Sequence, residues 1–183
     1  EQRGEIAAML HRHLREKGVR LALGDGLQQI EERAPGQLTV TLASGNQIPA
    51  DLVILAIGVR PESELAARAD LPLGPRGHIL VNEHMQTADP DIYAVGDAIQ
   101  VIHPITGAAT AIPLAGPANR QARIAADHIT GKDSAYRGTM GTSIVKVFDL
   151  TAACTGTNSQ TLEKQGIPFL SSITHSNDHV GYY

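Results

Sequence analysis

The sequence is poor in cysteine and in aromatic residues. Among 183 residues there is one cysteine, no tryptophan and an aromatic fraction of 3%. A single cysteine excludes an internal disulfide framework, so we expect a reducing, cytoplasmic environment. Because 42% of the residues are hydrophobic and so few of them are aromatic, the predicted core consists of aliphatic side chains and alanine.

Three further features are missing. The chain has 15 basic and 19 acidic residues, a net charge of −4, so its charge does not support a nucleic-acid partner. The longest apolar run is far too short to span a membrane, and no signal peptide opens the chain. No Gly-x-Gly-x-x-Gly occurs, so the pyrophosphate-binding turn of a dinucleotide site is absent.

Both ends of the sequence look like cut ends. Glu1 opens without methionine inside an amphipathic helical pattern, and Gly181-Tyr-Tyr183 follows a strand-like run. We therefore expect the chain to be a piece of a longer protein.

Hydrophobic periodicity and turn residues predict mixed helices and strands. The predicted helices span residues 1–17, 62–69, 116–129 and 158–165. The predicted strands span 19–23, a meander at 27–32, 38–42 and 47–48, and then 52–57, 78–81, 92–95, 99–102, 110–112, 142–148, 151–157 and 169–174. Along the helix at 116–129, residues 124, 125, 128 and 129 are expected on the inner side.

The strongest motif is Thr87-Ala-Asp-Pro-Asp-Ile-Tyr-Ala-Val-Gly-Asp97. A turn at residues 89–91 precedes a short apolar strand. Gly96 at its carboxyl end permits close approach to the backbone. Asp97 follows, where open α/β sheets bind ligands, and its carboxylate suits a sugar or polyol hydroxyl.

This motif resembles the second flavin-binding motif of the FAD- and NAD(P)-dependent pyridine nucleotide-disulfide oxidoreductases. The resemblance implies that Asp97 bonds the ribityl chain of FAD and that Gly96 lies beside it. It also implies an α/β fold class: part of a Rossmann-like, FAD/NAD(P)-binding two-domain fold with a β-meander, followed by the start of an α+β dimerisation domain.

A second segment, Asp51-Leu-Val-Ile-Leu-Ala-Ile-Gly-Val-Arg-Pro61, contains a continuous apolar run typical of a parallel strand buried on both faces. It resembles the family segment that closes the nucleotide domain beside the nicotinamide. The resemblance implies that Ile57 and Gly58 lie near NAD(P)H. A plain buried strand with a glycine turn is the alternative.

A third match is Pro113-Leu-Ala-Gly-Pro-Ala-Asn-Arg120. Gly116 before Pro117 predicts a helix start, whose free N–H groups carry partial positive charge. In the family this helix end points at the flavin ring, which implies backbone contacts from Leu114, Ala115 and Gly116. The loop is most similar to the branch of CoA-disulfide reductases, NADH oxidases and NADH peroxidases.

The last 45 residues resemble the start of the family's interface domain, which implies a homodimer. The resemblance also implies that Tyr182 or Tyr183 reaches the redox cysteine of the other subunit, with interface packing as the alternative. Cys154 has apolar neighbours and is expected to be buried rather than redox-active. Neither the His11/His13 pair, expected to be solvated, nor the His175/His179 pair predicts a metal site.

The resemblance divides the chain into the end of a NAD(P)-binding domain (1–75), a returning FAD segment (76–138) and the start of a dimerisation domain (139–183). It implies a flavoprotein that passes a hydride from NAD(P)H through FAD to a cysteine-based centre supplied by the missing N-terminal half. Disulfides, oxygen, peroxide and polysulfide remain open as acceptors, as do NADH and NADPH. The alternative is a non-catalytic nucleotide-binding or dimerisation module.

Overall fold

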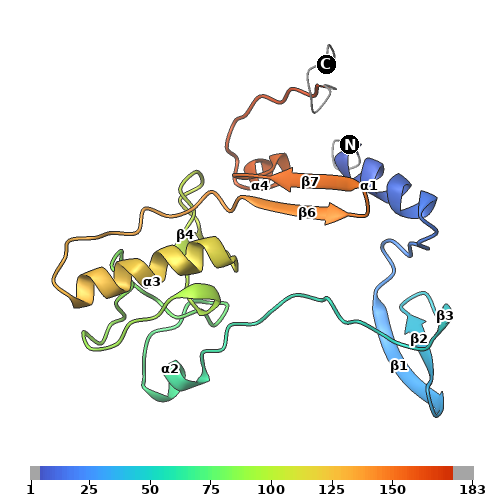
Figure 1. The fold of residues 1–183 in the computed structure, drawn as a ribbon, viewed down its shortest axis with the longest axis horizontal. Helices are drawn as coiled ribbons and strands as arrows, with labels where there is room; N and C mark the ends of the chain where they lie inside the picture. Colours follow the sequence, from blue (N-terminus) through green and yellow to red (C-terminus); the bar gives the residue numbers. More distant parts are fainter. Residues whose placement is uncertain (1–4, 175–183) are drawn as a thin grey trace. The chain divides into compact units, whose positions relative to one another are not determined.

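A computed structural model describes residues 5–174 of the chain (Figure 1). Its residues divide into two compact units. One comprises the residues up to Val59 together with Val147–Leu150, and the other comprises Arg60–Lys146 with the described residues from Thr151 onward.

The first unit begins with helix α1, Glu5–Glu16. The chain leaves the helix at Gly18, which has a φ of +84°. This left-handed conformation closes the helix, and residues other than glycine adopt it only with strain. The Val19 N–H then bonds to the Leu14 carbonyl at 3.0 Å, which completes the helix cap.

Strands β1 (Leu27–Ala34), β2 (Gln37–Leu42) and β3 (Gln47–Ala50) form an antiparallel meander in the order β1-β2-β3. Its register places Ile30 and Ile48 on either side of Val40, so three apolar side chains share one face. The predicted meander is therefore confirmed. Hydrogen bonds from the Ser44 hydroxyl and then the Ser44 N–H tie its second turn to Asp25 and lower the pKa of that carboxyl.

The turn Phe148-Asp149 packs on α1 within this unit. Lys17 Nζ lies 3.0 Å from Asp149 Oδ1 and 5.8 Å from the centre of the Phe148 ring. His13 Nε2 lies 2.9 Å from the same carboxylate oxygen. The hydrogen bond from Lys17 is the main reason why the pKa of Asp149 is lowered. His13 is therefore not the solvated side chain that the sequence predicted, since only 18% of it is exposed.

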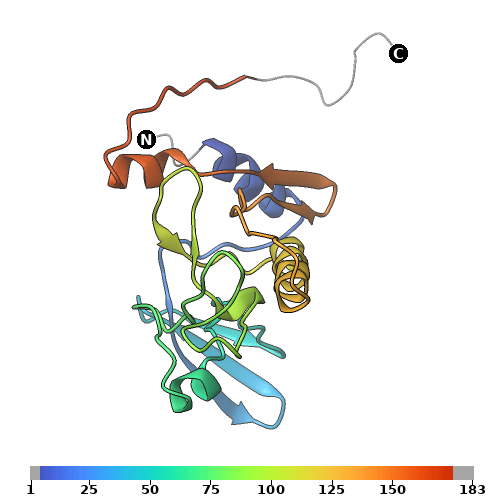
Figure 2. The same ribbon diagram turned by 90° about the vertical axis from the view of Figure 1, so that its left-hand side faces the viewer.

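The second unit has an aliphatic core around helix α3, Ala115–Ile129. The same unit contains three shorter features before α3: helix α2 (Glu64–Arg68), the 3-10 helix η1 (Gly96–Ala98), and the hairpin of β4 (Val101–Ile102) and β5 (Ala109–Thr110). In Figure 2, α3 is seen nearly along its axis with the loops of this unit beside it. The buried core residues are Ala66, Leu71, Ile79, Met85, Ile99, Val101, Ile124 and Ala125.

Strands β6 (Ser143–Val147) and β7 (Leu150–Cys154) form a two-stranded sheet, and helix α4 (Ser159–Lys164) follows. Asn158 caps α4 because its side-chain oxygen accepts the Thr161 N–H at 2.9 Å. The helix predicted at 158–165 is confirmed.

Several predicted strands are wrong for this structure. Residues 19–23, 52–57 and 169–174 are irregular, and residues 78–81 and 92–95 contribute only isolated bridges. The physical reason is that a strand needs a neighbour for its backbone N–H and C=O groups. Among residues 5–174, no strand pairs with the stretch 52–57, whose Ile54 and Ile57 are 80% and 83% exposed.

Two predicted burials are also wrong. Cys154 is exposed, with Sγ 3.1 Å from Ser143 Oγ, because no layer formed by residues 5–174 covers it on the β6–β7 ribbon. Ile129 is 63% exposed, since α3 ends at this residue, while Ile124 and Ala125 are buried as expected.

None of the helices within the described range has the length and apolar character needed to cross a membrane. In the same range, no three His, Cys, Asp or Glu side chains are grouped so that they could hold a metal ion.

Candidate functional site

The segment that leads to Asp97 is held by its own turn. The Thr87 side chain, in a residue that is only 8% exposed, donates to the Asp89 carbonyl at 3.1 Å and accepts the Asp89 N–H at 3.2 Å. The Asp91 N–H then bonds to Asp89 Oδ1 at 2.9 Å. These short-range bonds fix the turn before Ile92, so the chain reaches Asp97 in a defined direction.

Gly96 places η1 directly against α3. Its φ of +78° is the left-handed conformation that glycine adopts without strain. Its N–H donates to Gln121 Oε1 at 2.8 Å, and a Cβ at this position would lie 3.8 Å from Ala118 Cβ. Asp97 is the next residue, and its carboxylate is exposed to solvent.

The N-terminus of α3 lies on the same part of the unit. Leu114 is the N-cap residue and provides no side-chain cap, and Ala115 and Gly116 are exposed. Their N–H groups have no partner within the helix and bear its partial positive charge. Pro117, at the third helical position, has no N–H. The site therefore combines an acceptor, the Asp97 carboxylate, with backbone donors suited to an electron-rich group.

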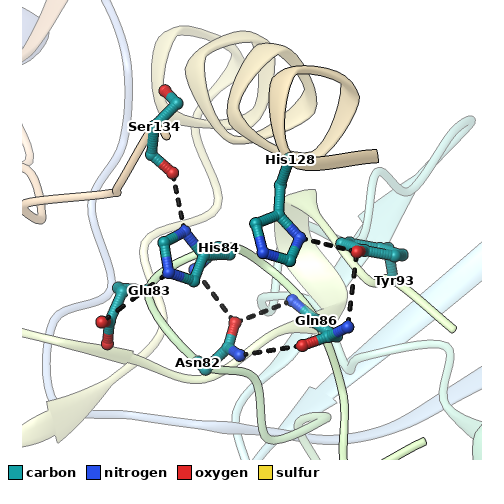
Figure 3. Close-up of polar contacts among 7 residues, drawn as sticks. All are labelled: Asn82, Glu83, His84, Gln86, Tyr93, His128 and Ser134. Carbon is teal, nitrogen blue, oxygen red and sulfur yellow. Dashed lines mark hydrogen bonds and ion pairs between the residues drawn. The ribbon is translucent and has the colours of Figure 1, made fainter. Parts of the chain in front are cut away.

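A polar cluster joins the same segment to the other end of α3 (Figure 3). The Tyr93 hydroxyl lies 2.7 Å from His128 Nδ1, and the His128 ring stacks on His84 with centroids 4.4 Å apart. His84 Nδ1 lies 2.8 Å from the Ser134 carbonyl oxygen. Because a carbonyl oxygen can only accept, His84 Nδ1–H donates this hydrogen bond. Gln86 Nε2 donates to Tyr93 Oη at 3.4 Å.

Ile57 and Gly58 belong to the first unit, whereas Asp97 and α3 belong to the second. Ile57 and Gly58 lie in the exposed irregular stretch, where Gly58 has a φ of +95°. Tyr182 and Tyr183, and with them His175 and His179, lie outside the described residues.

Sequence reasoning missed Gln121, the residue that connects the motif to the helix. A signal was present, because Gln121 lies three and four residues before Ile124 and Ala125 and so interrupts the apolar face of α3 with an amide. It also missed Tyr93 and His128 as partners, since 35 residues separate them in the sequence.

The fold combines helices with small sheets, and comparison with known proteins identifies its family. A family model described as pyridine nucleotide-disulphide oxidoreductase matches residues 3–122. The chain belongs to this family, and the predicted resemblance and fold class are confirmed.

Three relatives illustrate the similarity. An NAD(P)H sulfur oxidoreductase (CoA-dependent) of Pyrococcus furiosus is 35% identical over 98% of this chain and 40% of its own length. The structure of reduced CoADR-RHD from Bacillus anthracis is 51% identical over 97% of this chain and 32% of that chain, with a TM-score of 0.91. A water-forming NADH oxidase from Lactobacillus brevis, bound to NADH, is 31% identical over 87% of this chain and 35% of that chain, with a TM-score of 0.81.

The chain thus spans about 40% of the length of the curated relative from Pyrococcus furiosus.

Proposed function

We propose that this chain forms the returning flavin segment, with its flanking regions, of an NAD(P)H-dependent flavoprotein oxidoreductase. The observation that supports the proposal is the position of Asp97 on η1, held by the Gly96–Gln121 hydrogen bond against the helix whose N-terminus is open. For this protein we keep, as part of the proposal, the domains expected from the sequence: nucleotide-binding 1–75, flavin-binding 76–138 and dimerisation 139–183.

The residues present fit FAD. The ribityl chain of the flavin bears hydroxyl donors, and the exposed Asp97 carboxylate accepts hydrogen bonds only. The backbone at Ala115 and Gly116 offers uncapped N–H groups and positive potential to the electron-rich side of a ring, whereas the Leu114 N–H donates to the Ile112 carbonyl at 2.9 Å. When bound, FAD supplies the two-electron chemistry, while these residues bind and orient it.

Ile57 and Gly58 by themselves do not form a complete site for NAD(P)H. The sequence has no Gly-x-Gly-x-x-Gly turn, and the exposed stretch 52–59 lies free of neighbouring strands within the described residues. We propose that this stretch becomes a nucleotide-domain strand when the remaining portion pairs with it, which would bring Ile57 and Gly58 beside the nicotinamide.

Similarity to the sulfur oxidoreductase and the NADH oxidase supports a disulfide, a sulfur compound or oxygen as the acceptor. Within this proposal Tyr182 or Tyr183 donates a proton near the reacting sulfur of a homodimeric, cytoplasmic enzyme. Phe replacement at one of these positions should slow turnover and leave flavin reduction unchanged.

The exposed apolar stretch favours a second reading for the isolated 183 residues, in which they act only as a binding or dimerisation module. Since Ile54 and Ile57 remain in solvent, the nucleotide part is incomplete in this chain alone. The isolated chain should not retain FAD through purification.

The test replaces Asp97 by alanine in the longer flavoprotein. Loss of the acceptor removes hydrogen bonds worth about 1–3 kcal/mol, so the Kd for FAD should rise roughly 5- to 150-fold. Asp91→Ala is the matched control, because Asp91 is an exposed residue of the same motif whose backbone N–H, not its carboxylate, bonds to Asp89 Oδ1 in the turn. If Asp97→Ala binds FAD as tightly as Asp91→Ala, the proposal is wrong.

A further inference from the structure

Gln121 is a buried polar side chain in the middle of α3. Its exposed fraction is 2%, and it and Thr87 are the buried polar or charged residues of the described part of the chain. Burying an amide is unfavourable unless it is hydrogen-bonded. Oε1 of Gln121 meets this requirement by accepting the N–H of Gly96, the residue before Asp97, at 2.8 Å.

The hydrogen bond from Gly96 matters because η1 has little internal support. The helix has three residues, and its N-cap, Val95, provides no side-chain cap. The bond that closes its turn, from the Ile99 N–H to the Gly96 carbonyl, is long at 3.4 Å. The shorter bond to Gln121 therefore fixes the peptide that precedes Asp97.

The face of α3 that carries Gln121 also contacts η1 one turn nearer to the N-terminus of the helix. Ala118 lies one turn before Gln121 and faces Gly96, where a Cβ would be 3.8 Å from Ala118 Cβ. The Ala118 N–H in turn bonds to the Leu114 carbonyl at 3.2 Å. One helical turn thus links the anchor of Asp97 to the N-terminus of α3.

A second contact holds the segment farther from Asp97. Tyr93 lies three residues before Gly96, and its hydroxyl is 2.7 Å from Nδ1 of His128, seven residues after Gln121 on α3 (Figure 3). Together the two contacts attach both ends of the segment 93–96 to α3. Gln121 holds the end that presents Asp97.

We propose that Gln121 is a positioning residue for the flavin site: its carboxamide fixes the orientation of Asp97 relative to the N-terminus of α3. This inference rests on the proposed function, because it assigns Asp97 and the helix end to the same ligand. Gln121 itself acts through Gly96 and makes no contact with the flavin.

The test compares two variants of the longer flavoprotein. Gln121→Met keeps the side-chain length and volume but removes the acceptor. Ile124→Val shortens a neighbouring core residue on α3, 5% exposed, and so lowers stability without touching Gly96. The Kd for FAD, the thermal midpoint, and hydrogen exchange of a peptide covering residues 94–100 without FAD are measured for each.

Gln121→Met should raise the Kd for FAD about tenfold, as expected for the loss of one buried hydrogen bond at the binding turn, and should speed exchange in the 94–100 peptide. Ile124→Val should lower the thermal midpoint and leave both of these quantities at the wild-type value. Wild-type FAD affinity and exchange in Gln121→Met would overturn the proposal, as would a loss of affinity in both variants that simply follows their loss of stability.

Failure of the proposed function gives a different result. In that case Asp97→Ala binds FAD as the wild type does, whereas exchange in the 94–100 peptide of Gln121→Met still shows whether Gln121 holds η1.

Discussion

The exposed apolar stretch at residues 52–59 allows a sharp test, in which Ile54 and Ile57 are replaced by serine in the 183-residue chain. Such substitutions in a buried strand are among the most damaging to a fold. In this structure, however, both side chains are about four-fifths in solvent, with exposures of 80% and 83%.

The expected magnitude follows from that exposure. Fully burying an isoleucine stabilises a protein by about 1.5–3 kcal/mol, so the fifth that is covered contributes at most about 0.6 kcal/mol per residue. The free energy of unfolding of the double variant, measured in urea, should therefore lie within about 1 kcal/mol of the wild-type value. It should also bind less of a hydrophobic dye and aggregate less, because a flat apolar segment with free backbone groups is a site for edge pairing.

The assay is urea unfolding followed by circular dichroism, with dye binding measured on the folded protein. If the free energy of unfolding of this chain fell by more than about 2 kcal/mol, the two isoleucines would have to be buried, which would refute the reasoning. In the longer flavoprotein, the same double substitution should instead be severely destabilising, because there we propose that the strand is paired.

Three other predictions concern the two units. Ile99→Ala should destabilise the second unit by about 2–5 kcal/mol in the same urea assay, because Ile99 is 1% exposed in its core. Tyr93→Phe should lower the free energy of unfolding by about 1 kcal/mol, because it removes the hydrogen bond between the Tyr93 hydroxyl and His128. An unchanged free energy of unfolding would show that this hydrogen bond is not formed. The pKa of Asp149 is lowered, first by its hydrogen bond from Lys17, so its contribution to stability is present above the unfolded-state pKa of about 4 and is lost as the pH falls through the folded value. Wild type should therefore lose more stability than Asp149→Asn between pH 7 and pH 3, and equal losses would show that the contact is not formed.

Elements determined by local sequence were predictable. The meander follows from the alternation at Leu38–Leu42 and from turns at 34–36 and 44–46, which bring consecutive strands together. The start of α3 was predicted to within one residue, because Pro117 favours the first turn of a helix, although the helix begins at Ala115 and Pro117 occupies its third position. In both cases the residues that decide the structure lie within a few positions of one another.

Elements that depend on distant neighbours were not predictable. The apolar run 52–57 has the composition of a buried parallel strand, but composition does not supply the adjacent strands that such a strand needs. Within the described residues those neighbours are missing, and the run is left in solvent. Cys154 shows the same limit on a smaller scale, since its apolar sequence context does not decide whether another layer covers β7.

The residues proposed to face the ligand were named from the sequence, and the residues that hold them in place were not. Asp97 and the helix end at Ala115 stand in motifs that can be read along the chain. Gln121 and His128, which hold the motif in place, become visible only when α3 is packed against it. Their partners lie 25 and 35 residues away, beyond the reach of any local pattern.

The two nucleotide-related parts of the chain consequently differ in how far they are assembled. The flavin segment is built around a core that this sequence supplies itself, with Ile99 and Ile124 only 1% and 5% exposed and with η1 already bonded to α3. The nucleotide segment has its meander but leaves its longest apolar stretch uncovered. Because a preformed site loses less conformational entropy on binding than one that must be ordered, the proposed FAD contacts at Asp97 and the α3 N-terminus would need little further ordering. Under the same proposal, the NAD(P)H contacts at Ile57 and Gly58 would be created by strand pairing, so a longer chain that supplies the adjacent strands should order this segment far more than the segment around Asp97.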